Sequence, residues 1–173
     1  MENKDTKITR VDFDEKGKRT HYEDIEVGLY MGEMDWVIEP DMVTKQCQVD
    51  DDYNEFYMRD DTVFGGRIVP PQITYRPPRW LVSRNYNIRG VFYKWEFENV
   101  RPMKPGQKMK ISGYVTDKWI KNNKEFVQYD AQGVDEEGNV LFTTRRVHAL
   151  DVIDRDAPRS GEGVDSGIKK EKL

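Results

Sequence analysis

The chain has 173 residues, of which 36% are apolar and 35% are charged, and its formal net charge is -4. This length suits one domain with a substantial core. The modest apolar fraction leaves that core thin, so pairing with a second copy or a related chain would help to cover it. The acidic balance argues against broad binding to nucleic-acid phosphates, which needs a basic face.

Cysteine and histidine usage excludes several kinds of site. Cys47 is the only cysteine, which rules out an intramolecular disulfide and a thiolate metal cluster. His21 and His148 have no second ligand at metal-binding spacing, so we expect both to be structural. The chain shows no apolar signal segment and no run of roughly 18 apolar residues. We therefore expect a soluble cytoplasmic protein with no metal, no cofactor, and neither nucleic acid nor membrane as partner.

Composition divides the chain into three parts. Residues 1–19 are polar and charged and are expected to form a flexible N-terminal segment. Residues 20–152 contain the predicted domain. Residues 153–173 combine charge with glycine and serine, which is typical of a disordered tail.

The first half of the domain combines strand and helix patterns. Residues 29–38 alternate apolar and polar side chains, which predicts a strand. Pro40 suits the first turn of a short helix that ends near Val49, before three aspartates. Residues 50–63 place aromatic side chains among acidic ones, so part of this segment is expected to turn inward.

The stretch from Phe64 to Val82 predicts a loop that leads into the central helix. Paired glycines suit a sharp bend, and Pro70-Pro71 suits a helix start, with helix expected over 71–83. Pro77-Pro78 interrupts this segment, because neither proline has a backbone donor. Either the helix kinks there, or a short turn is followed by a second helix.

The second half predicts an antiparallel meander. Large apolar and polar residues alternate along four extended segments, which are expected at 92–100, 108–119, 125–134 and 140–150. Turns separate these segments, the tightest at Pro105-Gly106. The simplest way to bury one helix beside such a meander is to wrap the sheet around it, which gives an α+β fold.

Several ordered motifs resemble those of the MaoC-like (R)-specific hydratases and dehydratases, which have the hot dog fold. Residues 22–28 match the family's Tyr-x-Asp-x-x-x-Gly, and residues 64–71 read Phe-Gly-Gly-Arg-Ile-Val-Pro-Pro. Residues 97–107 and the strand pair around 136–139 continue the match. The Val-Pro-Pro form is similar to the N-terminal type, found as half of double hot dog enzymes and as separate subunits. The resemblance implies a central helix wrapped by a curved antiparallel sheet, dimeric or pseudo-dimeric.

The resemblance also implies a site. Active members carry Asp-x-Asn-x-x-His, whose aspartate and histidine polarise the water that adds to, or leaves, an enoyl thioester. Here Asp52 and Asn54 match that motif, and Tyr57 replaces the histidine. An ordinary tyrosine is a poor base at neutral pH, although it can donate a proton or orient water.

Three functions follow from the resemblance, and each acts on an acyl thioester of coenzyme A or of a carrier. In the first, Asp52 is the base, Tyr57 supplies the proton, and the loop before the central helix binds the thioester. The implied substrate-binding residues are Gly66, Val69, Pro70, Pro71, Gln72 and Arg76. In the second, the chain is a catalytically silent substrate-binding subunit of a partner that bears the Asp/His pair. The third is an acyl-CoA thioesterase, because the hot dog fold hosts that activity too.

A purely structural interpretation stays open at the same residues. Asp and Asn side chains after a helix commonly satisfy local backbone groups. In that interpretation Tyr57 is a buried aromatic residue and Gly65-Gly66 is only a bend. Arg76 belongs to a local group with Arg79, Arg84 and Arg89, which forms either a clamp for a coenzyme A phosphate or a solvated helix face.

Overall fold

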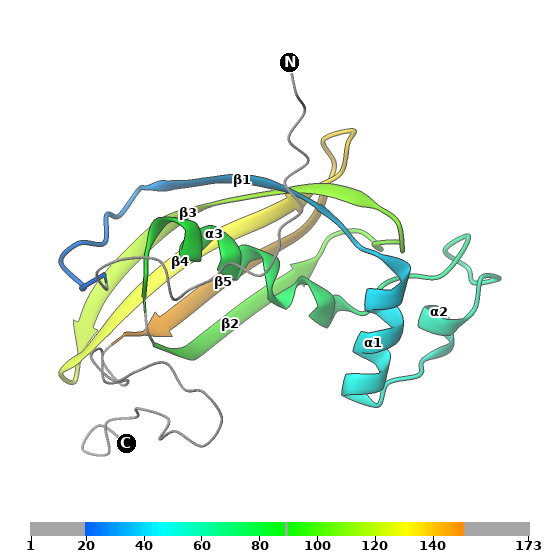
Figure 1. The fold of residues 1–173 in the computed structure, drawn as a ribbon, viewed down its shortest axis with the longest axis horizontal. Coiled ribbons are helices and arrows are strands. Elements are labelled where there is room, and N and C mark those ends of the chain that lie inside the picture. The colour runs from blue at the N-terminus through cyan, green and yellow to red at the C-terminus, as the bar shows by residue number, and fades with distance from the viewer. Residues whose placement is uncertain (1–19, 89, 151–173) are drawn as a thin grey trace.

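The computed structural model describes residues 20–88 and 90–150, and Figure 1 shows its elements. Five strands and several short helices follow one another along the chain. In order, they are β1 (Tyr30–Val37), α1 (Pro40–Asp50), α2 (Glu55–Met58), the 3-10 helix η2 (Pro71–Tyr75), α3 (Pro77–Asn85), β2 (Val91–Asn99), β3 (Lys108–Lys121), β4 (Lys124–Val134) and β5 (Val140–Ala149).

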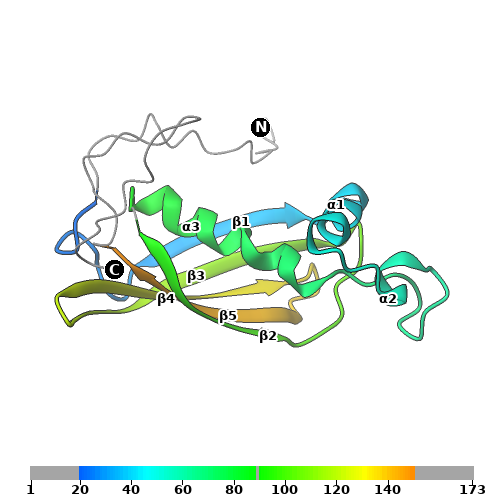
Figure 2. The same cartoon turned by 90° about the horizontal axis from the view of Figure 1, so that it is seen from below.

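The strands form one antiparallel sheet in the order β1-β3-β4-β5-β2, which leaves β1 and β2 at its edges. Helix α3 lies along one face of this sheet, as Figure 2 shows, while α1 and α2 lie beyond one end of it. The predicted α+β architecture, with a central helix packed on a curved antiparallel sheet, is confirmed.

The core lies between α3 and the covered face of the sheet. Leu81 of α3, Ile111 of β3 and Phe142 of β5 are completely buried there. The carboxyl end of α3 is held to β1, because the Asn85 side-chain amide donates to the Met31 carbonyl over 2.9 Å. The central helix is therefore fixed by apolar burial along its length and by hydrogen bonds at its end.

The central segment is two helices rather than one kinked helix. Its first part is the 3-10 helix η2, and α3 begins immediately after it, at Pro77. The first amides of an α-helix have no partner within the helix, so a proline pair loses nothing at the first two positions. This is the second of the two arrangements that the sequence allowed.

The acidic segment contains a helix that the sequence pattern did not predict. Helix α2 has only four residues, too few to show a helical period. Phe56 and Tyr57 in it are half-buried, whereas Tyr53 and Met58 are exposed. The expectation that part of this segment turns inward is thus met by two of its aromatic residues.

Three of the predicted features lie outside the described residues. These are the flexible segment at 1–19, the tail at 153–173 and the side chain of Arg89. Among the helices that the structure describes, none has the length and apolar character needed to span a membrane.

We expect Gly113→Ala to lower the free energy of unfolding. A Cβ at this position of β3 would lie 2.4 Å from the Asp130 carbonyl oxygen of β4, so the paired strands would have to separate. Overpacking of this kind costs about 1–3 kcal/mol, which urea denaturation would measure. The control is Gln132→Ala, an exposed side chain on the same strand pair. Equal stability of the two variants would contradict the packing argument.

Candidate functional site

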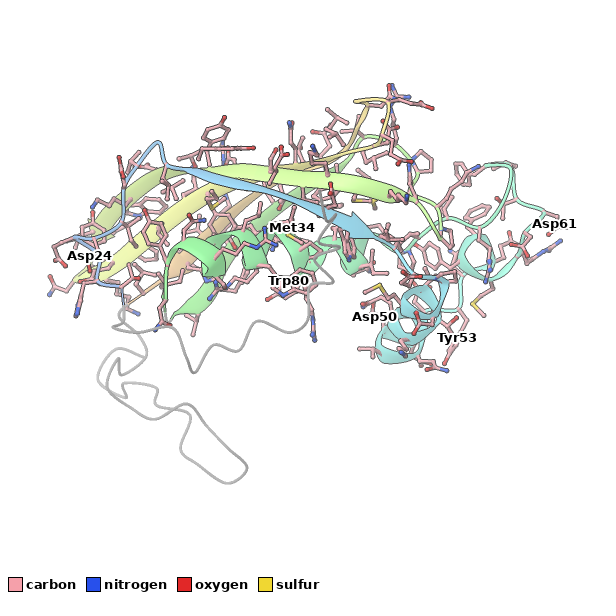
Figure 3. The ribbon with its side chains drawn as sticks, turned by 45° about the horizontal axis from the view of Figure 1, so that its top comes forward. Asp24, Met34, Asp50, Tyr53, Asp61 and Trp80 are labelled. Carbon is pink, nitrogen blue, oxygen red and sulfur yellow. The ribbon has the colours of Figure 1, made fainter. Side chains whose placement is uncertain are left out.

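The connection between α1 and α2 places the acidic candidates by local backbone bonds. Asp51 adopts the left-handed conformation, with φ of 51°, and the Asp52 amide donates to the Cys47 carbonyl over 3.0 Å, which ends α1. Asp52 Oδ1 then accepts the Asn54 amide over 3.2 Å. Asn54 Oδ1 accepts the Phe56 amide over 3.0 Å and so caps α2. Figure 3 shows Asp50 and Tyr53 at this connection.

Tyr57 is the candidate whose environment is most changed by the fold. Its side chain packs against the core, and burial raises the pKa of its hydroxyl above the ordinary value of 10.0. The charge of Asp52 raises this pKa further, followed by that of Cys47. Tyr57 is therefore protonated at neutral pH, and it can donate a proton or hold a water but cannot act as the base.

Tyr57 borders a small cavity of about 210 Å³ beside the amino end of η2. Val69 and Pro71 line the same cavity, so the structure brings together three of the predicted site residues. The loop is tied to α2, because the Ile68 amide donates to the Phe56 carbonyl over 2.9 Å.

Two polar residues at this cavity were missed from the sequence. Asn99 ends β2, and Arg101 follows it in the turn towards β3. Residues 97–107 belong to the matched motif, which could have indicated them. Nothing in one sequence says, however, that this turn folds back over the start of η2.

Fewer backbone amides are available to a ligand at the cavity than the sequence allowed. The Val69 amide donates to the Met103 carbonyl over 2.9 Å, so it is not available to a ligand. Pro70 and Pro71 have no amide hydrogen. Among the described residues, the amides of Gly66 and Gln72 have no backbone acceptor. Gly66 sits in a turn closed by the Thr62 hydroxyl, which donates to its carbonyl, and does not line the cavity.

Gln72 and Arg76 face a different space. They line a wider groove of about 540 Å³ between α1 and the central segment. Its walls are largely aromatic and apolar, with Trp36, Trp80 and Trp95 among them. Figure 3 labels Trp80, on the central helix. Five of the predicted site residues thus line one or other of these two spaces, whereas four line neither: Asp52, Asn54, Gly66 and Pro70.

The arginines of this region do not converge with Arg76. Arg79 bonds the Ser83 hydroxyl within α3, and Arg84 donates to the Glu33 carbonyl on β1 over 3.1 Å. These contacts fix two of the arginines to the protein scaffold. They give no support to a clamp that would bring these guanidinium groups together on one phosphate.

Burial makes Cys47 and His148 poor candidates for further chemistry. Burial raises the pKa of the Cys47 thiol, which disfavours the reactive thiolate. Burial, with Arg79 and Arg146 nearby, lowers the pKa of His148 to about 3, so this ring is neutral. Its Nε2 lies 3.2 Å from the Tyr129 hydroxyl, while Nδ1 has no partner among the described residues. The described residues contain no group of three or more metal-binding side chains.

We expect Tyr57 to ionise above pH 10. The titration is the ultraviolet difference between the wild type and Tyr57→Phe. Asp52→Asn should bring this pKa down only in part, because burial, the larger cause, remains. Because the pKa of Tyr57 is raised in the folded state, protonated Tyr57 contributes to the free energy of unfolding. This contribution is fully present below pH 10 and is lost as the pH rises through the folded-state pKa. Ionisation below pH 10 would contradict the assigned environment.

Comparison with known proteins identifies the fold. No family model matches the sequence, and no curated protein matches it. Among solved structures, the monoamine oxidase regulatory protein of an Archaeoglobus species is 15% identical with a TM-score of 0.68, covering 78% of this chain and 95% of that one. The R-hydratase PhaJ1 of Pseudomonas aeruginosa is 19% identical with a TM-score of 0.62, covering 75% and 84%.

A third structure is a heteromeric complex. The (3R)-hydroxyacyl-ACP dehydratase HadBC of Mycobacterium tuberculosis has a chain 8% identical to this one, with a TM-score of 0.65, covering 71% of this chain and 96% of that one. At such low identity the comparison establishes the fold and leaves the activity to be tested. This chain has the hot dog fold, and its structural neighbours include R-hydratases and MaoC-like dehydratases.

Proposed function

We propose that this chain takes part in the hydration of 2-enoyl thioesters, or in the reverse dehydration of 3-hydroxyacyl thioesters, within an assembly of hot dog chains. One observation carries the proposal: Tyr57 borders a cavity at the amino end of η2. The Asp52 carboxylate does not line this cavity, but its charge is close enough to raise the pKa of Tyr57. The fold of the neighbouring hydratases and dehydratases agrees with this activity.

In this proposal Asp52 is the proton acceptor and Tyr57 is the proton donor. Asp52 takes a proton from water while the water oxygen bonds to C3 of the enoyl group, and Tyr57 gives its proton to C2. Proton transfer from Asp52 to Tyr57 then restores both groups. Gln72 lines the wider groove rather than the Tyr57 cavity, so we place the thioester across the start of η2, between the two spaces. There the Gln72 amide, which has no backbone acceptor among the described residues, is the donor proposed for the thioester carbonyl.

A second candidate is the catalytically silent subunit. The Asn54 side chain caps α2, and Tyr57 stays protonated, so neither residue replaces the histidine of the motif as a base. Asp52 is then left without the second member of the Asp/His pair, which favours a subunit that is inactive alone. In this candidate the wide aromatic groove and the small cavity shape the acyl path for a partner chain that carries the Asp/His pair.

The β2 edge is the surface proposed for assembly. The strand pairs with β5 on one side and has no partner on the other among the described residues. Tyr93 is 63% exposed on it and Trp95 is 36% exposed. An unpaired edge that carries exposed aromatic side chains is a natural site for strand pairing with a second hot dog chain.

We expect Asp52→Asn to lower kcat for crotonyl-CoA hydration by about 100-fold and Tyr57→Phe by about 10- to 100-fold, because each removes a proton-transfer group. The matched control is Asp50→Asn, an exposed aspartate that bonds Gln46 in α1. Absorbance of the enoyl thioester follows turnover, and a thiol dye separates hydrolysis from hydration. Full activity of Asp52→Asn would overturn the assigned base.

Tyr57→His decides between the enzyme and the silent subunit. If the chain is silent because the histidine is lost, the wild type alone should show only the background rate of the assay. Tyr57→His should then turn over substrate at least about tenfold above that background rate. If the wild-type chain is active alone, the silent-subunit candidate fails.

We expect the purified chain to sediment as a dimer, or to co-purify with a second hot dog chain. Tyr93→Lys should weaken this association at least about tenfold, because a charge on an edge strand opposes strand pairing. Tyr53→Lys is the matched control, since Tyr53 is 56% exposed but lies outside the sheet. A wild-type monomer that is fully active would contradict the proposed assembly.

A further inference from the structure

Arg146 of β5 is a buried cation without a counter-ion among the residues that the structure describes. Its side chain is 0% exposed, and no carboxylate of the described residues forms an ion pair with it. Removing a guanidinium from water is costly unless its donors and its charge are compensated. The neighbouring Arg145 differs, because it lies on the other face of the sheet and pairs with Asp130 over 2.7 Å.

The compensation comes from the end of η2. Arg146 Nη1 donates to the Tyr75 carbonyl, and Nη2 donates to the Thr74 carbonyl over 3.1 Å. Thr74 and Tyr75 are the last two residues of η2. No amide of the same helix donates to the carbonyls at its end, so these carbonyls are free to accept hydrogen bonds from Arg146. A cation is favoured at this end of a helix. The planar fork of arginine presents Nη1 and Nη2 to the two carbonyls in a fixed geometry.

Aromatic rings and one hydroxyl fix the guanidinium in this position. The rings of Tyr75, Phe92 and Trp95 lie 5.5, 5.7 and 5.6 Å from its central carbon. Nε donates to Thr144 Oγ1 over 3.2 Å. The same hydroxyl accepts Trp95 Nε1 and donates to the Glu96 carbonyl, each over 2.9 Å, so its hydrogen-bonding capacity is full.

We propose that Arg146 is a positioning residue, which holds the carboxyl end of η2 so that its amino end faces the Tyr57 cavity. This inference rests on the proposed function. Helix η2 has only five residues, and its first, Pro71, lines the cavity while its last two are bound by Arg146. We therefore expect a change at one end to shift the other, and with it the Gln72 amide proposed as the carbonyl donor.

The test compares Arg146→Met with Arg145→Met in the full chain. Hydrogen exchange in peptides covering 71–80 should become at least about tenfold faster in Arg146→Met, while the β3–β4 hairpin stays unchanged. In an active wild type, kcat should fall by about 10- to 100-fold with KM changed much less, because the donor is displaced while the binding walls remain. Arg145→Met should alter neither measurement.

The outcomes separate the inference from the proposed function. Unchanged exchange over 71–80 overturns the role of Arg146, whatever the activity. Faster exchange with unchanged kcat shows a purely structural role and also overturns it. Absence of turnover in the wild type, alone and with a partner, defeats the proposed function, while exchange still decides whether Arg146 holds η2. If Arg146→Met does not fold, Arg146→Lys and Thr144→Val carry the same comparison, because each removes part of the bonding.

Discussion

The docking of the central segment, residues 71–85, onto one face of the sheet is the interaction on which the rest of the structure depends. Its apolar side chains supply the helix side of the core, and Leu81 is completely buried there. The segment can turn sharply at its start and in its middle because prolines occupy positions where a helix does not use an amide donor. The same prolines prevent it from being one long helix, so the short η2 is left to be held by contacts from the sheet.

Those contacts are polar, and leaving any of their buried donors or acceptors without a hydrogen-bond partner would cost free energy. The guanidinium of Arg146 lies below the end of η2 with its charge opposite carbonyls and aromatic faces rather than a carboxylate. Each donor and acceptor around Thr144 is used, which favours one arrangement over its alternatives. The edge strand β2 contributes to this network through Trp95. Through Trp95, the edge strand thus contacts the guanidinium that binds the end of η2.

The candidate site itself is built by short-range bonds outside the sheet. Asp52 and Asn54 are used in ending α1 and starting α2, as the structural interpretation expected. The same bonds also fix the position of the Asp52 carboxylate, whose charge raises the pKa of Tyr57. The fold is shared with a hydratase and a dehydratase that are less than 20% identical in sequence. The hot dog fold hosts several activities, so the side chains in the site decide what this chain does.

Alternation of apolar and polar residues determined the sheet. All five predicted strands occur, with ends within two residues of those predicted, because alternate side chains must face the core. Pro40 and the acidic turn likewise determined α1. Helix α2 was missed because four residues show no period, and two proline pairs alone could not say whether the central helix would kink or divide.

The sequence by itself therefore determined the strands, α1, the fold class and the motif Asp52-x-Asn54-x-x-Tyr57, since these depend on local pattern. Only the tertiary structure decided what surrounds each residue. The turn after β2 packs against the loop that precedes η2. There the Met103 carbonyl accepts the Val69 amide, and Arg101 lines the cavity. The tertiary structure also placed Gln72 and Arg76 in a separate groove and buried Arg146 beneath η2. Such contacts join residues far apart in the chain, and no local pattern of side chains encodes which of them will meet.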